Sequence, residues 1–150
     1  QVTWNLDLLP ASMRDEQVTD LAAAQGSGGT LANGTYYYVV TVTDRYGEGK
    51  KCAELTAVVA SGGGTAVLDL TWSAVAGATG YRIYRATVSG TYTGYLTSAT
   101  NSKTDTGAAL TLGTPPSGSA AFFITRVVDY GLKGGSRVRM SFILCPYIFL

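Results

Sequence analysis

Leu68-Asp69-Leu70-Thr71-Trp72 and Gly80-Tyr81-Arg82-Ile83-Tyr84-Arg85 are the two stretches that decide the fold of this chain. In both stretches an apolar residue stands at every second position, which is the period of a β-strand with one buried face. The short link of residues 76–79 predicts that the two strands are neighbours, with Trp72 buried where two sheets meet. The pattern therefore predicts a β-sandwich, an architecture that leaves the function open.

The size and composition of the chain fit one sandwich domain with flanking arms. The chain has 150 residues, of which 19 are Gly and 10 are Tyr, and only 14% are charged. These tendencies are typical of sheet surfaces and tight turns. The 11 basic and 10 acidic residues give a net charge of +1, which argues against a general affinity for nucleic acid or an anionic membrane. A partner is therefore expected to be a protein or a glycan.

A Tyr-rich hairpin precedes the two deciding strands. Residues 36–44 predict its first strand, residues 45–51 a charged loop and residues 53–59 its second strand. The outer set of the first strand is Tyr37, Val39, Thr41 and Thr43, which is not very polar. This outer face is either covered or an ordinary sheet surface rich in β-forming residues, and we favour the second interpretation.

The remaining boundaries follow from turn residues and proline. Residues 1–28 predict an N-terminal arm with a short helix that begins near Ser12, and residues 25–29 predict a flexible joint. Residues 29–118 form the sandwich, in which residues 92–97 predict a short strand and 103–107 a tight turn. Residues 110–118 predict an extended exit linker because they contain Pro115-Pro116.

Residues 119–150 form a third segment with a second alternating pattern. Residues 122–129 and 137–144 flank the Gly-rich stretch 131–136, which predicts a β-hairpin. Because an isolated two-stranded hairpin is marginal in water, it either adds to the sandwich edge or belongs to an interface with another chain. The apolar end, residues 142–150, is shorter than the ~20 residues that a membrane-spanning helix needs.

Four stretches of the chain together resemble fibronectin type III and related immunoglobulin-like domains of bacterial and phage proteins. These are residues 34–44 with Gly47-Glu48, residues 70–72, residues 77–85, and Thr104-Asp105-Thr106-Gly107. The resemblance covers residues 30 to 117 and implies an immunoglobulin-like sandwich. In such domains the Trp strand comes first and the Tyr-rich hairpin last, whereas here the hairpin precedes Trp72. The resemblance therefore implies a permuted strand order.

The side chains that common enzyme mechanisms need are scarce. No His is present, which excludes catalysis and metal binding that depend on His. The carboxylates Asp44, Glu48, Asp69 and Asp105 fall in predicted turns or at outward positions, so we interpret them as solvated surface rather than as an acid pair. A calcium site made of Asp44, Glu48 and Asp105 lacks the usual dense run of acidic ligands. No cofactor is expected, and Cys52 and Cys145 are either one disulfide or two buried thiols.

Two sets of surface residues are candidates for recognition. Tyr37, Tyr46, Tyr84, Tyr92 and Tyr95 are either an aromatic binding platform or ordinary sheet residues. Arg137 and Arg139 lie on one face of their strand, and with Lys133 they are either a contact for an acidic neighbour or charges that protect a sheet edge.

The permuted, Gly- and Thr-rich pattern is similar to segments of tailed-phage structural proteins, and this resemblance implies a non-enzymatic role. We expect a virion protein, in capsid decoration, tail or fibre, that contacts other virion proteins and forms a homo-oligomer. The alternative is a carbohydrate-binding or adhesin module on a bacterial surface. The predicted core residues are Tyr36, Tyr38, Val40, Val42, Leu68, Leu70, Trp72, Tyr81 and Ile83. The predicted interface residues are Trp4, Leu8, Leu9, Arg137, Arg139, Phe142, Ile143, Leu144, Ile148 and Phe149.

Overall fold

The computed structural model describes residues 17–44 and 47–116 in full, and the backbone of residues 126–131 and 137–142. The chain divides into a compact unit of residues 1–120 and a second unit of residues 121–150. All regular structure in the described residues is β-strand, and the strands pair in an antiparallel manner. Within these residues, no helix is long and apolar enough to cross a membrane.

The larger sheet of the first unit is built around the Tyr-rich strand β2 (Gly34–Asp44). One edge of β2 pairs with β6, and the other pairs with β4 and then β3. The strands β7 and β9 continue the sheet beyond β6. The bounds of these strands are β3 Gly47–Glu48, β4 Leu55–Val59, β6 Gly80–Ala86, β7 Gly94–Ser98 and β9 Thr111–Leu112.

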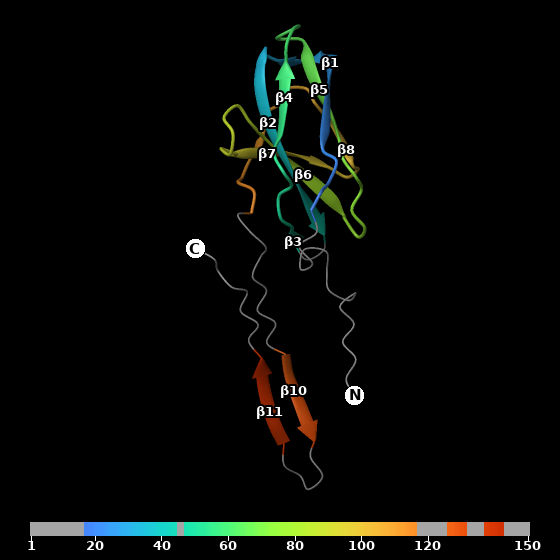
Figure 1. Cartoon of the computed structure of the whole chain (residues 1–150), viewed down its shortest axis with the longest axis vertical. Helices are drawn as coiled ribbons and strands as arrows, with labels where there is room; N and C mark the ends of the chain where they lie inside the picture. Colours follow the sequence, from blue (N-terminus) through green and yellow to red (C-terminus); the bar gives the residue numbers. More distant parts are fainter. Residues whose placement is uncertain (1–16, 45–46, 117–125, 132–136, 143–150) are drawn as a thin grey trace. The chain divides into compact units, whose positions relative to one another are not determined.

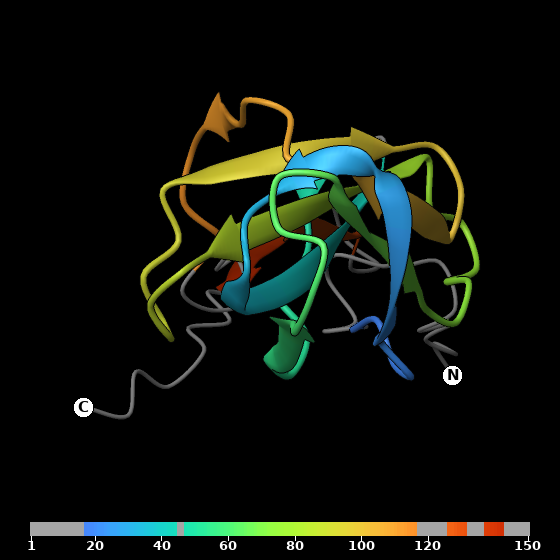
Figure 2. The ribbon, with the colours of Figure 1, turned by 90° about the horizontal axis from the view of Figure 1, so that it is seen from above.

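The smaller sheet contains β1 (Ala22–Leu31), β5 (Ala66–Thr71) and β8 (Ser102–Asp105), with β5 in the middle. It is stacked on the larger sheet, as the two views of the ribbon show (Figures 1 and 2). The first unit is therefore a β-sandwich of two antiparallel sheets, as the alternating pattern predicts.

The core lies between the two sheets and contains the residues that the alternation selects. All nine predicted core residues are buried. The Trp72 and Tyr81 rings, one from each side of the core, meet edge to face with centroids 5.2 Å apart. The Tyr81 hydroxyl accepts a hydrogen bond from the Val75 amide at 2.9 Å, so its polar tip is satisfied. The residue pattern and the burial agree because each strand has one face turned to the partner sheet.

The Gly-rich segment that predicted a flexible joint is part of strand β1, so that prediction is wrong. Residues 22–27 pair with residues 66–71 of β5, and the pairing register shifts between Ser27 and Leu31. A Cβ atom at Gly29 would lie 2.4 Å from the Ala66 carbonyl oxygen, and Gly28 has a φ of 107°. Glycine is needed here because the two backbones approach closely around a bulge.

Two further local predictions are wrong for a similar reason. Residues 102–105 form β8 where a tight turn was expected, and residues 111–112 of the expected exit linker form β9. Strand β8 is polar throughout and β9 has only two residues, so neither sequence shows a period of two. The expected helix lies mostly outside the described residues, and residues 17–21 within it form no helix.

The outer face of β2 is covered at its centre, which corrects the interpretation that it is an ordinary sheet surface. Val39 is 1% exposed and Thr41 is fully buried, and Tyr84 beside them on β6 is also fully buried. The larger sheet therefore has a buried region on each of its two faces.

The second unit contains the hairpin that the sequence predicts, with shorter strands. Strands β10 (Arg126–Gly131) and β11 (Arg137–Phe142) are antiparallel, and their register places Asp129 opposite Arg139.

Replacing a core leucine should destabilise the sandwich far more than the same change at an edge. Leu70 is 1% exposed and Leu112 is 87% exposed. Leu70→Ala should lower the free energy of unfolding by about 2–5 kcal/mol, because it leaves a cavity. Leu112→Ala should change it by no more than about 0.5 kcal/mol. Urea unfolding of the full chain measures both variants, and equal losses would contradict the placement of the core.

Candidate functional site

The Asp105 carboxylate is the most enclosed charged group among the described residues. It lies at the end of β8, is fully buried, and faces β2 and β6 of the opposite sheet. Arg85 Nη1 donates to both of its oxygens, at 2.6 and 2.9 Å, and the Tyr38 hydroxyl donates to Oδ2 at 2.7 Å. The Gly107 amide adds a fourth hydrogen bond at 2.9 Å. The charges of Arg85 and Asp105 are thus paired. Because Arg85 and Tyr38 belong to the larger sheet and Asp105 to the smaller one, the cluster connects the two sheets across the core.

Burial determines the protonation of Tyr38 in this cluster. The loss of solvent raises the pKa of the Tyr38 hydroxyl far above its usual value, and the neighbouring Asp105 carboxylate raises it further. The hydroxyl therefore remains a hydrogen-bond donor to Asp105 across the whole physiological pH range. The arrangement of Tyr38, Arg85 and Asp105 therefore indicates a structural role and not proton transfer.

Glu48 organises a second cluster on the outer face of the larger sheet. Its carboxylate accepts hydrogen bonds from the Thr41 hydroxyl at 2.6 Å and from the Tyr84 hydroxyl at 2.7 Å. Arg82 Nη1 lies 2.6 Å from Glu48 Oε2, and its guanidinium lies 4.6 Å from the centre of the Tyr95 ring. Burial raises the pKa of Tyr84, and the hydrogen bond to Glu48 acts in the same direction. The cluster covers the centre of β2.

The carboxylates that the sequence singled out do not converge on one cleft. Asp105 lies between the sheets, whereas Glu48 lies on the opposite face of the larger sheet. Asp69 is exposed and accepts a hydrogen bond from Thr104, and Asp44 accepts one from the Gly47 amide. The expectation of solvated surface is thus wrong for Asp105, which is fully buried. The pair of facing carboxylates that glycoside hydrolysis needs is not assembled by these four residues.

The same separation applies to the calcium candidate. Asp105 is enclosed by Tyr38 and Arg85, away from Asp44 and Glu48. Over residues 17–44 and 47–116, no three Asp, Glu, Cys or His side chains gather as metal ligands.

Glu54 holds the loop of residues 87–93 across β2. It accepts hydrogen bonds from the Ser89 hydroxyl at 2.6 Å, the Gly90 amide at 2.9 Å and the Tyr92 hydroxyl. Strand β2 lies between β6 and β4, so these hydrogen bonds link the loop after β6 to the residue that precedes β4. Burial raises the pKa of Tyr92, and its bond to Glu54 adds to that effect. The loop therefore adds a layer over the outer face.

These contacts leave little of the aromatic platform that the sequence suggested. Tyr84 is fully buried and Tyr92 is 5% exposed, so neither presents its ring to solvent. Tyr84 contacts Tyr95 with ring centroids 5.3 Å apart, and Tyr37 and Tyr95 are half-buried. Tyr46 lies outside the described residues. Tyr37, Tyr84 and Tyr95 are thus strand residues of the larger sheet, and Tyr92 belongs to the loop of residues 87–93.

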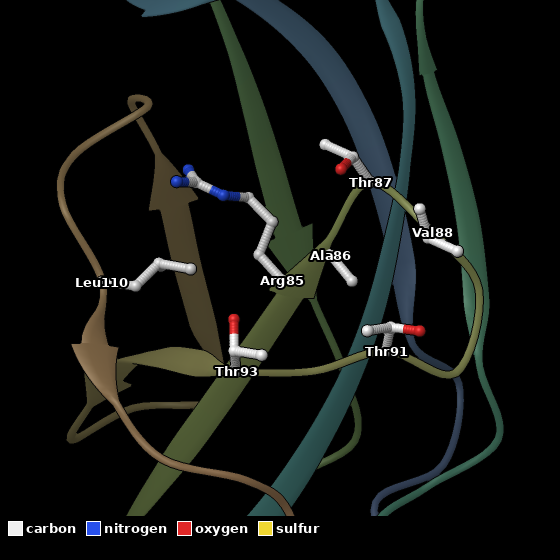
Figure 3. Close-up of a pocket in the computed structure, with 7 residues that line it drawn as sticks. All are labelled: Arg85, Ala86, Thr87, Val88, Thr91, Thr93 and Leu110. Carbon is white, nitrogen blue, oxygen red and sulfur yellow. The ribbon is translucent and has the colours of Figure 1, made fainter.

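A shallow pocket of about 340 Å³ lies at the end of β6 (Figure 3). Leu110 stands on one side of it, and the loop after β6 forms the other side. Arg85 Nη1 pairs with Asp105 and its Nη2 donates to the Ala108 carbonyl at 3.1 Å, so the guanidinium is already engaged. The lining offers threonine hydroxyls and aliphatic groups, without a carboxylate or a thiol. The lining residues are Arg85, Ala86, Thr87, Val88, Thr91, Thr93 and Leu110.

Cys52 is a buried thiol beside β2. Its sulfur accepts a hydrogen bond from the Val40 amide at 3.1 Å, and burial raises the pKa of the thiol. A raised pKa keeps the reactive thiolate scarce at neutral pH. Cys145 lies outside the described residues, so the alternatives of one disulfide and two buried thiols stay open.

The predicted interface residues lie outside the side chains that the structure describes. Arg137, Arg139 and Phe142 are placed only by the backbone of β11. The others fall outside the described ranges altogether; they are Trp4, Leu8, Leu9, Ile143, Leu144, Ile148 and Phe149.

The sequence analysis missed the pairings that organise these clusters. Asp105 stands 67 residues from Tyr38, and Glu54 stands 38 residues from Tyr92. No local pattern links residues at such separations, although Asp105 in the Thr-Asp-Thr-Gly stretch belongs to the resemblance noted above. No protein-family model matches the chain, and no curated protein is similar to it in sequence.

Removing the charge of Asp105 should strongly destabilise the sandwich, because Arg85 would then be left unpaired in a nearly buried position. Asp105→Asn should lower the free energy of unfolding by about 3–5 kcal/mol. Asp69→Asn, the same substitution at an exposed site, should change it by no more than about 0.5 kcal/mol. Chemical denaturation of the full chain provides the comparison, and a loss for Asp105→Asn as small as that of the control would refute the structural role of the pair.

The raised pKa values of Tyr38, Tyr84 and Tyr92 predict a loss of stability at alkaline pH. The folded chain keeps these protons, whereas the unfolded chain releases them above the ordinary tyrosine pKa of about 10. Stability is therefore fully present below that pH and falls above it, by about 1.4 kcal/mol per pH unit for each tyrosine.

Tyr38→Phe should make this dependence shallower by about 1.4 kcal/mol per pH unit, since one of the three groups is removed. Denaturation at a series of alkaline pH values, with phenolate absorbance as a second readout, measures the slope. An unchanged slope would contradict the enclosure of the Tyr38 hydroxyl.

Proposed function

We propose that this chain is a non-enzymatic structural protein of a bacteriophage virion, which acts through protein–protein contacts. We further propose that its sandwich is of the fibronectin type III kind, with permuted strand order. The partners in this proposal are other capsid or tail proteins and further copies of the chain. Nucleic acid, membranes and cofactors have no part in it.

The observation that supports the immunoglobulin-like part of the proposal is the order of strands in the two sheets. If β5 with Trp72 is the second strand and β6 with Tyr81 the third, the Tyr-rich hairpin β2 and β4 supplies the sixth and seventh. Immunoglobulin-like domains place the third, sixth and seventh strands side by side, and the first, second and fifth in the other sheet. The orders β6–β2–β4 and β1–β5–β8 fit this arrangement with the hairpin moved forward in the chain.

The use of the charged groups supports a non-enzymatic role. The carboxylates of Glu48, Glu54 and Asp105 each accept several hydrogen bonds from their neighbours, and each holds strands or a loop together. The pocket beside Arg85 contains no acid and base pair. A sandwich in which these groups are committed to internal contacts suits a building block better than a catalyst.

The second unit supports a role in assembly. A two-stranded hairpin has at most marginal stability in water, and β10 with β11 is such a hairpin. A hairpin of this kind gains stability from a partner.

The virion location is tested on particles. Phage particles are purified on a density gradient from a lysate of the phage whose genome encodes the chain. An antibody raised against the full chain should detect it in these particles. It should band with capsid or tail proteins, while a replication protein of the same lysate should be absent from the band. Detection only in the unassembled fraction would refute the virion role.

A further inference from the structure

Three edge strands of the sandwich carry features that hinder pairing with another chain. Strand β8 contains Lys103 and Asp105, and β9 has two residues and is followed by Pro115-Pro116. Strand β1 has a register shift at its Gly28 end. Charges, short length, proline and bulges are the features by which sheet edges avoid unwanted pairing.

Strand β4 has none of these features. Its sequence, Leu55-Thr56-Ala57-Val58-Val59, is uncharged, contains no proline and pairs with β2 without a register shift. Among the described residues no strand pairs with its other edge, and Val58 is 56% exposed there. Strand β1 comes close to β4 without pairing with it, and its Gln25 hydrogen-bonds to the residues that follow β4, through Ala60 N and Ser61 O. The backbone of β4 is thus open to an added strand.

We propose that β4 is a strand-addition surface, and that the strand it takes is β11 from the hairpin of a second copy of this chain. This inference rests on the proposed role in assembly and names the partner surface. The added strand would turn the marginal hairpin into part of a larger sheet. The contact is heterologous, so it builds rings or open chains of copies instead of closed two-fold dimers.

Charge is the first argument for this partner. Residues 121–150 contain four basic residues and one acidic residue, while residues 1–120 contain seven basic and nine acidic residues. The two units therefore have opposite net charge, which favours the hairpin of one copy against the sandwich of another. Two hairpins would bring Arg137 and Arg139 of both copies together, and like charges across a strand pair are unfavourable.

The residue patterns of the two strands also match. In β4 the residues Leu55, Ala57 and Val59 share the core side, while Thr56 and Val58 share the outer side with Glu54. In β11 the apolar positions Val138, Met140 and Phe142 alternate with Arg137, Arg139 and Ser141. An added β11 can therefore extend the apolar side of β4 while its arginine positions share the side of Glu54.

The association state of the full chain tests the proposal. Sedimentation equilibrium from low micromolar to submillimolar concentration should show a series of oligomers. Val58→Lys places a charge on the β4 edge at an exposed position and should weaken the association by about tenfold or more. Leu112→Lys places the same charge on the opposite edge, where Leu112 is 87% exposed, and should leave the association unchanged. Thermal unfolding of both variants checks that the sandwich remains folded.

Hydrogen exchange locates the contact independently of any variant. Amides of residues 55–59 and of residues 137–142 should both become slower to exchange as the concentration rises. If the wild-type chain associates and the Val58→Lys and Leu112→Lys variants associate as well as it does, β4 is not the contact surface, and the assembly role still stands. A monomer at every concentration, or protection that does not depend on concentration, would overturn the second copy as partner, whereas the particle experiment judges the virion role separately.

Discussion

The bond between Arg85 and Asp105 is the interaction on which the arrangement of the two sheets depends. Arg85 comes from the larger sheet, Asp105 from the smaller one, and the Tyr38 hydroxyl completes the pairing from β2. A charge buried without its partner costs several kcal/mol, so sheet placements that separate these groups are strongly unfavourable. Hydrophobic contacts such as Trp72 with Tyr81 stabilise the sandwich without fixing one register, because they tolerate sliding. The ion pair therefore contributes specificity.

The same chemistry recurs on the outside of the larger sheet. Glu48 binds Tyr84, and Glu54 binds Tyr92, so a carboxylate holds a tyrosine hydroxyl in each of three places. This repeated pairing explains how a chain with only 14% charged residues buries polar groups at the centre of β2 without leaving them unsatisfied. It also engages the carboxylates of Glu48, Glu54 and Asp105. Their oxygens are occupied by groups that organise the fold.

The sandwich and the hairpin have complementary needs. Among the described residues the uncharged strand β4 has an unpaired edge, and the unit with the β10–β11 hairpin has an excess of basic residues. Each of these features is unfavourable in an isolated molecule, because open edges aggregate and lone hairpins are marginal. Together they are consistent with a protein whose stable state is reached in an assembly, which is the role that the resemblance to phage structural proteins implies.

Alternation in the sequence predicted the strands with a period of two, the nine buried core residues and the C-terminal hairpin, because alternation is a local property of the chain. The sequence did not predict β1, whose glycines allow a close approach to β5. It also did not predict β8, whose polar residues show no alternation of apolar and polar positions. The burial of Asp105, the covered outer face of β2 and the edge of β4 that is unpaired among the described residues all depend on how the sheets come together. These properties depend on contacts between residues such as Tyr38 and Asp105, 67 positions apart, and such contacts exist only after the sheets have come together.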